Sequence, residues 1–214
     1  MKVTRAQAQR NRETVVNTAA GMFRKYGVAG VGIADVMRES GLTHGGFYGQ
    51  FSSKEALAGE SCARALTQNK AQWEGIQREH EARHGGDAGE GWHEPARRAM
   101  IREYLSHWHR ENPALGCTLA ALNGDSMRVG GAVSAAFTDG FKAILPVMER
   151  VVDAKRGEEA RQRALATMAQ MVGALVLARG VNDLAFAEEI LSAARMALDV
   201  DGLVPELEEA VSTA

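Results

Sequence analysis

The stretch His80-Glu81-Ala82-Arg83-His84 contains side chains that could perform metal-assisted chemistry. It fits the pattern H-E-x-x-H, which on a helix places two imidazoles on one face for zinc and a glutamate as general base. The motif lies in the polar run QREHEARH, and a glycine-rich segment follows it directly. Because a catalytic helix of this kind is normally buried, we expect a solvated helix end here. A zinc hydrolase stays a remote alternative, and we expect no bound metal and no cofactor.

Cys117 is a candidate for thiol chemistry. It lies in GCTLAALNGD, shortly after Asn112-Pro113, so we expect it at or beside the start of a helix. Unpaired backbone amides and the positive end of the helix dipole would stabilise a thiolate there. Such a thiolate could be alkylated or oxidised as a signal. The alternative is a small buried hydrophobe that closes the turn.

The stretch GLTHGGFYGQF (41–51) contains four glycines, one histidine and three aromatic residues between segments that favour helices. Two short helices separated by a tight turn at Gly41 and braced by a preceding helix form a helix-turn-helix. Its second helix, residues 43–48, would lie in the DNA major groove. The alternative is a plain glycine-rich linker, but the phenylalanines at 47 and 51 have helical spacing and should face inward.

Within this motif we expect the small residues to allow close approach and the polar ones to make contacts. Glycines inside a helix cost roughly 1 kcal/mol each, and such a cost is tolerated where the backbone must approach a phosphate or a base edge. Hydrogen-bond donors surround that approach. The predicted DNA-contacting residues are Thr43, His44, Gly45, Gly46, Tyr48 and Lys54.

Charge is unevenly distributed along the 214 residues. Residues 1–54 contain eight Lys or Arg and three acids, whereas the remaining 160 residues contain 17 Lys or Arg and 24 acids. A basic head on an acidic body predicts that the head meets a polyanion such as double-stranded DNA.

The rest of the chain predicts an all-α protein. The apolar residues recur at helical spacing, and Gly or Pro stands at the boundaries between segments. The strict alternation of apolar and polar residues that is typical of strands is absent. The first expected helix has an apolar stripe and ends at Gly27; the stripe consists of Val15, Ala19, Met22, Phe23 and Tyr26. The other expected helices are 33–40, 43–48, 53–83, 94–110, 118–128, 131–154, 158–179 and 184–199. No apolar run reaches 18 residues, the start does not resemble a signal peptide, and the two cysteines lie far apart. We therefore expect a cytoplasmic protein with reduced thiols and no membrane segment.

Residues 10–57 resemble the DNA-binding domain of TetR-family transcriptional repressors. The framework G-L-T-x-G-x-F-Y-x-x-F-x-S-K-E-A-L is complete between Gly41 and Leu57. The resemblance implies contacts to DNA from Thr43, Gly45, Tyr48 and Lys54. It also implies base reading by His44. Gly32 departs from the Thr or Ser that most members carry, which weakens the expected cap of the second helix.

The resemblance also implies how the chain is organised. A three-helix helix-turn-helix domain (1–53) would precede a roughly six-helix domain (54–214) that binds an effector and dimerises. A homodimer would bind a palindromic operator and release it when a small molecule binds. A helical adaptor without DNA affinity is the alternative from another class.

Two groups of apolar residues are candidates for the effector pocket and the dimer interface. Aromatic walls with few polar tips suit an apolar effector, although ordinary core packing gives the same pattern. The expected pocket residues are Trp73, Ile76, Tyr104, Trp108, Cys117, Phe137 and Phe141. The segment 158–179 is apolar nearly all round for its last three turns and needs partners on two sides. The expected interface residues are Met168, Val172, Leu175, Phe186, Ile190 and Leu191; a bundle within one chain is the alternative.

Overall fold

The computed structural model describes residues 4–84, 91–152 and 157–198, and every regular element in them is a helix. The N-terminal elements are α1 (Arg5–Tyr26), α2 (Ile33–Glu39), the 3₁₀ helix η1 (His44–Gly46) and α3 (Lys54–His84). The following elements are α4 (His93–Tyr104), α5 (His107–Glu111), α6 (Thr118–Val129), α7 (Gly131–Val152), α8 (Glu158–Gly180) and α9 (Leu184–Ala197). The predicted all-α class is confirmed. Within the described ranges, no helix is long and apolar enough to cross a membrane.

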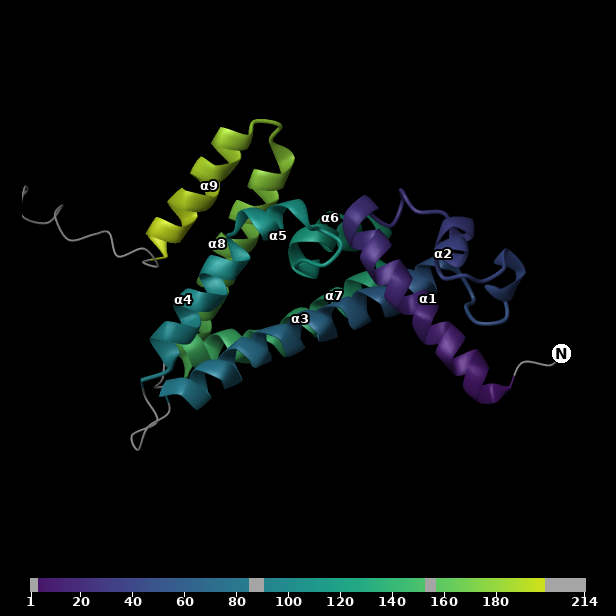
Figure 1. Cartoon of the computed structure of the whole chain (residues 1–214), viewed down its shortest axis with the longest axis horizontal. Coiled ribbons are helices and arrows are strands. Elements are labelled where there is room, and N and C mark those ends of the chain that lie inside the picture. Colours follow the sequence, from purple (N-terminus) through teal and green to yellow (C-terminus); the bar gives the residue numbers. More distant parts are fainter. Residues whose placement is uncertain (1–3, 85–90, 153–156, 199–214) are drawn as a thin grey trace, which may run out of the picture.

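The head consists of α1, α2, η1 and the start of α3, gathered at one end of an elongated molecule (Figure 1). Thr4 caps α1 by accepting a hydrogen bond from the Gln7 amide (3.2 Å). The predicted stripe buries Val15, Ala19 and Phe23 completely. Gly27 ends the helix with φ of 72°, a left-handed conformation that glycine adopts at little cost.

The predicted helix at 43–48 is wrong in type. The chain forms one 3₁₀ turn, His44–Gly46, preceded by Thr43 in an extended conformation without a side-chain cap bond. Single turns then continue through Phe47, whose carbonyl accepts from the amides of Gln50 (2.8 Å) and Phe51 (3.0 Å). The two adjacent glycines explain the difference. Glycine has a low helix propensity, so the segment contains too few helix-favouring residues to form an α-helix.

The remainder of α3 and helices α4 to α9 form the body. Helix α3 runs from the head into the body without interruption and packs along α7 (Figure 1). Its cap is Ser53, whose Oγ accepts from the Ala56 amide at 3.1 Å. The helix therefore begins one residue later than the capping box of Ser52 and Glu55 would place it. Glycines allow the close packing: a Cβ on Gly59 would lie 2.8 Å from the Ala132 Cβ, and one on Gly140 would lie 2.4 Å from Leu66 Cδ1.

The helix predicted at 94–110 is divided into α4 and α5. Leu105 takes a non-helical conformation (φ −91°, ψ 39°), and Ser106 starts the second helix by accepting from the His109 amide at 3.1 Å. The break turns both Leu105 and His109 into the interior. The helical pattern is continuous in the sequence, but the burial of these side chains favours a break between the two helices.

Candidate DNA interface and effector pocket

The predicted DNA-contacting residues lie together on the surface of the head. Thr43, His44 and Gly45 are exposed, and Tyr48 is 67% exposed. The His44 and Tyr48 rings meet edge to face with centroids 5.8 Å apart. Gly46 and Lys54 are half-buried, Lys54 at the first position of α3. The segment therefore offers hydrogen-bonding groups on a surface that the chain itself leaves uncovered.

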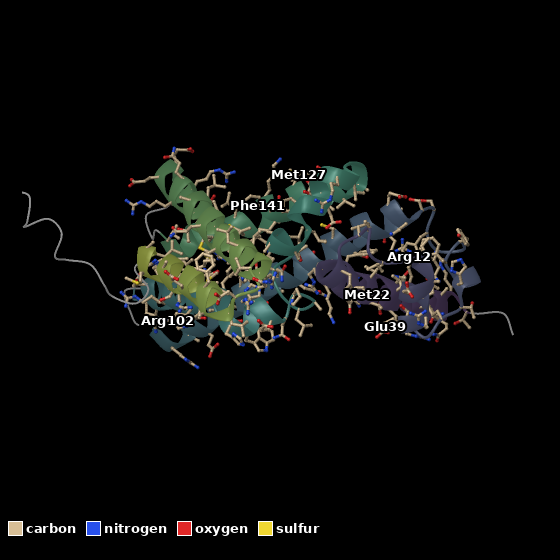
Figure 2. All side chains as sticks on the ribbon, turned by 90° about the horizontal axis from the view of Figure 1, so that it is seen from above. Arg12, Met22, Glu39, Arg102, Met127 and Phe141 are labelled. Carbon is tan, nitrogen blue, oxygen red and sulfur yellow. The ribbon has the colours of Figure 1, made fainter. Side chains whose placement is uncertain are left out.

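Buried aromatic rings fix this segment to the rest of the head. Phe47 is completely buried and stacks on Phe51 with ring centroids 5.4 Å apart. The Arg12 guanidinium lies 4.6 Å from the Phe51 ring centroid and pairs with Glu60 at 2.5 Å. Arg12 is at the head end of the molecule in Figure 2. The prediction that the phenylalanines at 47 and 51 face inward is confirmed, since they join η1 to α1 and α3.

The two glycines of η1 differ in their surroundings. A Cβ on Gly45 would meet nothing within 4 Å, whereas one on Gly46 would lie 3.6 Å from Met37 Cε. Neither residue has a positive φ. Packing within the chain therefore does not require glycine at 45, and a close approach by another molecule is a reason for it that the geometry permits.

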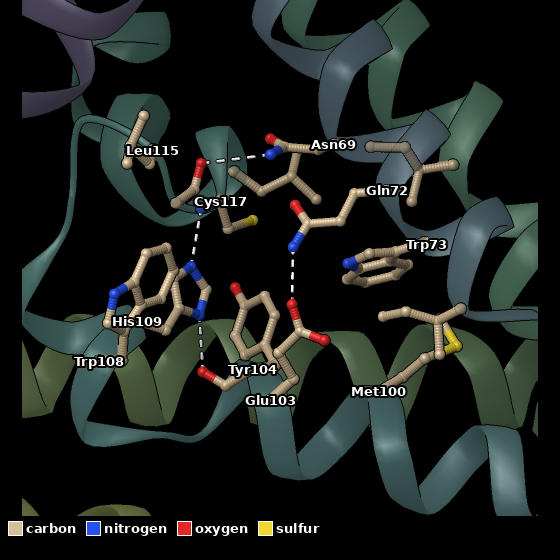
Figure 3. Close-up of a pocket in the computed structure, with 14 residues that line it drawn as sticks. Asn69, Gln72, Trp73, Met100, Glu103, Tyr104, Trp108, His109, Leu115 and Cys117 are labelled. Carbon is tan, nitrogen blue, oxygen red and sulfur yellow. Dashed lines mark hydrogen bonds between the residues drawn. The ribbon is translucent and has the colours of Figure 1, made fainter.

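A pocket lies between α3, α4, α5, α6 and α7 in the body (Figure 3). Five of the seven residues predicted to form it do line it, namely Trp73, Ile76, Tyr104, Trp108 and Cys117. The other lining residues are Asn69, Gln72, Met100, Glu103, His109, Leu115, Gly116, Leu119 and Ile144. Its volume of about 30 Å³ accommodates only one or two water molecules. An effector must therefore move part of the wall, and Trp108 (52% exposed) and Leu115 (63% exposed) have one side in solvent.

Phe137 and Phe141 do not line the pocket, which corrects the prediction. Both are half-buried on α7, and Ile144, one turn beyond Phe141, lines the pocket in their place. Phe141 and Arg102 lie at opposite edges of the body in Figure 2. The polar lining residues Asn69 and Gln72 could have been found, because they precede Trp73 and Ile76 at helical spacing on the same face of α3.

His109 is a functional candidate that the sequence reasoning missed. Its Nε2 lies 2.8 Å from the amide nitrogen of Cys117, which donates to it, so the proton must sit on Nδ1, 2.6 Å from the Tyr104 carbonyl. Burial is the largest cause that lowers the pKa of His109 to about 4, and the positive charge of Arg179 lowers it further. The hydrogen bond to the Tyr104 carbonyl acts in the opposite direction. The ring is therefore a neutral brace between α4 and the start of α6.

The hydroxyl of Tyr104 is the open polar position of the pocket. It is buried and makes no well-aligned hydrogen bond, although the Cys117 thiol lies close enough to affect its ionisation. Burial raises the pKa of Tyr104 well above its usual value, so the group is a protonated donor at neutral pH. An effector with a hydrogen-bond acceptor could satisfy it.

Cys117 is the residue that precedes α6, as predicted, but its thiol does not have the predicted ionisation. Burial raises the pKa of Cys117 above its ordinary value. The Tyr104 hydroxyl and the amides of Ala120 and Leu119 act in the opposite direction without reversing the shift. Desolvation of the buried thiol therefore outweighs the helix terminus in this conformation, which favours the alternative of a small buried residue that closes the turn.

The pocket loop is joined directly to the head. The Gly116 carbonyl accepts from Arg24 Nη1 of α1 (3.3 Å) and from Asn69 Nδ2 of α3 (3.2 Å). A second connection runs from the Val28 amide to Asp125 Oδ1 of α6 at 2.9 Å. Movement of the pocket wall at residues 116–117 would therefore be transmitted to the end of α1.

The zinc motif lies at the end of α3. His80 and Glu81 are half-buried, and Gln77 Nε2 donates to Glu81 Oε1 at 3.4 Å. The side chain of His84 lies outside the described residues. Among the side chains that are described, no group of three or more His, Cys, Asp or Glu could hold a metal ion.

The predicted interface residues fall into two groups. Met168, Leu175 and Leu191 are buried within the chain's own core and have no surface for a partner. Val172 and Ile190 are half-buried, and Phe186 is 49% exposed. Further apolar side chains on α8 and α9 are exposed: Leu165, Val176, Leu177, Leu184 and Met196.

Comparisons with known proteins agree on the family. Residues 15–60 match the family model described as bacterial regulatory proteins, tetR family. A comparison with curated proteins gives no match. A TetR transcriptional regulator from Chloroflexus aurantiacus J-10-FL is 27% identical, with a TM-score of 0.66 over 90% of this chain and 94% of that one.

Two further solved structures share the fold at lower identity. Escherichia coli NemR in its reduced form is 18% identical, with a TM-score of 0.71 over 91% of this chain and 97% of that one. A TetR-family regulator from Agrobacterium tumefaciens is 18% identical, with a TM-score of 0.67 over 89% and 98%. Residues 15–60 therefore match the DNA-binding part of the tetR family, and the described chain shares its fold with solved TetR-family regulators.

Proposed function

We propose that this regulator is a ligand-responsive repressor that binds a palindromic operator as a homodimer. In this proposal residues 1–53 bind DNA, and residues 54–214 bind the effector and the second subunit. The role is regulatory rather than catalytic, and the protein acts in the cytoplasm. The single observation that carries the proposal is the continuity of α3, which begins at Lys54 in the recognition surface and lines the pocket with Asn69, Gln72, Trp73 and Ile76.

The continuity of α3 supplies the mechanism. Lys54 and Asn69 are separated by about 22 Å along the helix axis, at 1.5 Å per residue. In this proposal the effector enlarges the small pocket by displacing α3 relative to its neighbours, and a tilt of α3 carries the head with it. In a dimer this changes the spacing of the two recognition segments, which must fit grooves about 34–36 Å apart. The effector releases the operator if it binds the displaced state more tightly.

The test has two steps. Duplexes selected from a random pool by the full-length protein should contain an inverted repeat, and sedimentation of the complex should show two chains per duplex. A screen for small molecules that raise the melting temperature should then yield compounds that also release the duplex. Selected sites without inverted symmetry, or stabilising compounds that leave binding intact, would contradict the proposal.

A second candidate is a repressor that senses electrophiles or oxidants through Cys117. The observation in its favour is the position of the thiol in the pocket wall, next to the Tyr104 hydroxyl and one residue from the Gly116 contact with Arg24. The raised pKa of the thiol opposes it, since the thiolate is the reactive form. Operator affinity before and after a mild electrophile, for wild type and Cys117→Ser, decides between the two. A loss of binding confined to the wild type would favour this candidate.

The remaining alternative, a zinc hydrolase at His80, Glu81 and His84, has only the sequence motif in its support. Zinc content of the protein purified without chelators tests it directly.

A further inference from the structure

A second cleft, separate from the aromatic pocket, lies where α1 meets the body. It has a volume of about 500 Å³, within the roughly 300–1,000 Å³ that is typical of small-molecule sites. Its lining residues are Arg24, Lys25, Arg110, Glu111, Pro113, Ala120, Ala121, Val176, Arg179 and Gly180. Four of these side chains are cationic and one is acidic, so the cleft has a formal excess of three positive charges.

Two of the three arginines of the cleft, Arg24 and Arg179, are held by carbonyl groups rather than by carboxylates. Arg24, only 7% exposed, donates from Nε to the Ala20 carbonyl (3.2 Å) and from Nη1 to the Gly116 carbonyl (3.3 Å). Arg179 donates from Nη2 to the His109 carbonyl (2.5 Å) and from Nε to the Arg110 carbonyl (3.2 Å). Carbonyl oxygens orient a guanidinium but leave its charge uncompensated.

Two of these guanidinium groups converge on one point of the backbone. Arg24 Nη1 bonds the Gly116 carbonyl, and a Cβ placed on Gly116 would lie only 2.9 Å from Arg179 Nη2. Arg179 Nη1 is buried and has no hydrogen-bond partner. Burial is the largest cause of a lowered pKa for both arginines. A pair of partly desolvated cations with an unused donor is costly unless an anion compensates it.

The single acid of the cleft does not provide that compensation. Glu111 pairs with Arg110 and is itself about half-exposed. Lys25 is exposed, with its Nζ 4.9 Å from the Tyr26 ring centroid, and it can turn toward the cleft at little cost. None of Arg24, Lys25 and Arg179 therefore pairs with the one carboxylate that lines the cleft.

We propose that this cleft is a binding site for a small phosphate-type dianion, either free phosphate or the phosphate group of a small metabolite. Planar guanidinium groups match the geometry of phosphate oxygens and bind them through paired hydrogen bonds. The concentration of like charge in a cleft with apolar walls (Pro113, Ala120, Ala121 and Val176) raises the local concentration of anions. The volume leaves room for an organic group beyond the phosphate.

The position of the cleft gives the ligand a role. Arg24 and Lys25 belong to α1 of the head, and Arg110 and Arg179 belong to α5 and α8 of the body. A dianion between them ties the head to the body in the arrangement seen here. By linkage it should change operator affinity, a consequence that rests on the proposed function, whereas binding itself does not.

Thermal unfolding of the full-length protein tests the site. Inorganic phosphate is compared with sodium chloride at equal ionic strength, and glycerol 3-phosphate is compared with inorganic phosphate. At about ten times Kd the melting temperature should rise by about 3–5 °C in phosphate alone. A larger rise with glycerol 3-phosphate identifies a phosphorylated metabolite as the ligand class, and equal rises identify free phosphate.

Two variants change the cleft without removing the buried arginines. Lys25→Ala removes an exposed cation, and Ala121→Glu places a carboxylate at a half-buried lining position. Both should lose most of the phosphate-dependent rise, whereas Lys142→Ala, an exposed position on α7 outside the cleft, should keep it. The proposal is overturned if sodium chloride gives the same rise or if both cleft variants keep it. It is also overturned if a short non-specific duplex abolishes the phosphate effect, because the cleft would then bind the DNA backbone.

Discussion

His109 is held in one protonation state by its two ring contacts. The amide of Cys117 donates to Nε2, so that nitrogen must stay unprotonated while the imidazole braces the pocket loop. Protonation would convert this hydrogen bond into a contact between two donors, in a buried site near Arg179. The pocket wall is therefore sensitive to pH through His109, a residue that was not among the predicted DNA-contacting or pocket residues.

The stability of the protein should fall in mild acid because of His109. Its folded pKa of about 4 lies below the ordinary value of 6.5, so the unfolded chain takes up the proton first as pH falls. The contribution is complete above about pH 6.5 and is lost toward pH 4, with about 2 kcal/mol lost between pH 7 and pH 5. Urea unfolding at both pH values measures it. His109→Gln should show a smaller dependence; equal slopes for wild type and variant would mean that His109 is not the responsible group.

Lys54 lies where a backbone phosphate contact is expected, at the first position of α3 beside the exposed segment of Tyr48. Lys54→Ala should weaken binding to all duplexes and reduce the slope of log affinity against log salt by about one. Fluorescence anisotropy across a salt series measures both values. Lys142→Ala is the matched control, because it removes the same charge from an exposed position in the body. An unchanged slope in Lys54→Ala would exclude the phosphate contact.

His44 should act differently from Lys54, because it is predicted to read a base edge. His44→Ala should relax the sequence preference at one position of each half-site, with about 1–3 kcal/mol of discrimination lost there. Competition between the selected operator and single-base variants measures this loss. A uniform loss across all duplexes would instead assign His44 to the backbone.

At the scale of elements, the contact between α3 and α7 determines how the body transmits movement. Gly59 packs against the side chain and backbone of Ala132, and Gly140 packs against Leu66. A Cβ atom at either glycine would lie too close to these neighbours to be accommodated. Close contacts of this kind behave as a rigid pair, since interiors packed at high density deform little. A displacement of α3 is therefore expected to involve α7.

Two glycines of α3 should respond in opposite directions to the same substitution. Gly59→Ala places a Cβ 2.8 Å from the Ala132 Cβ and 3.1 Å from its backbone, which should destabilise the protein by about 1–3 kcal/mol. Gly75→Ala meets nothing within 4 Å and should stabilise it by up to about 1 kcal/mol through helix propensity. Urea unfolding of both variants measures the difference. Equal effects would mean that the α3–α7 contact relaxes without cost.

At the scale of the whole molecule, apolar surface is concentrated on the last two helices. Leu177 is 61% exposed and Leu184 is 66% exposed, and together with Phe186 they place large apolar side chains on α8 and α9. Exposed apolar area of this kind commonly marks an interface. The homodimer in our proposal would cover it.

Phe186→Glu should shift the protein from dimer to monomer. It places a charge in the proposed apolar interface at a position that is half-exposed in one chain, so the monomer itself should still fold. Sedimentation velocity at micromolar concentration measures the association, and circular dichroism checks the fold. Met127→Glu, at a 73% exposed position on α6, is the control and should remain dimeric. If Phe186→Glu also remained dimeric, the interface would lie elsewhere.

The sequence alone determined the features that local interactions specify. The helical class, the end of α1 at Gly27 and the inward position of Phe47 and Phe51 follow from periodicity and from the conformational preferences of glycine. The positions of Trp73 and Tyr104 in the pocket wall also followed, because aromatic residues at helical spacing mark the buried faces of the helices. The framework between Gly41 and Leu57 was sufficient to indicate the family.

Only the tertiary structure decided the features that depend on residues far apart in sequence. Ile144 replaces Phe137 and Phe141 in the pocket because the register of α7 against α3 selects which turn faces inward, and periodicity cannot give that register. The pKa of the Cys117 thiol is raised because burial among residues from other helices desolvates it, although its helix terminus alone favours a thiolate. The convergence of Arg24 and Arg179 at Gly116 joins α1, α8 and the loop before α6, and it is set by packing between helices rather than by any local pattern.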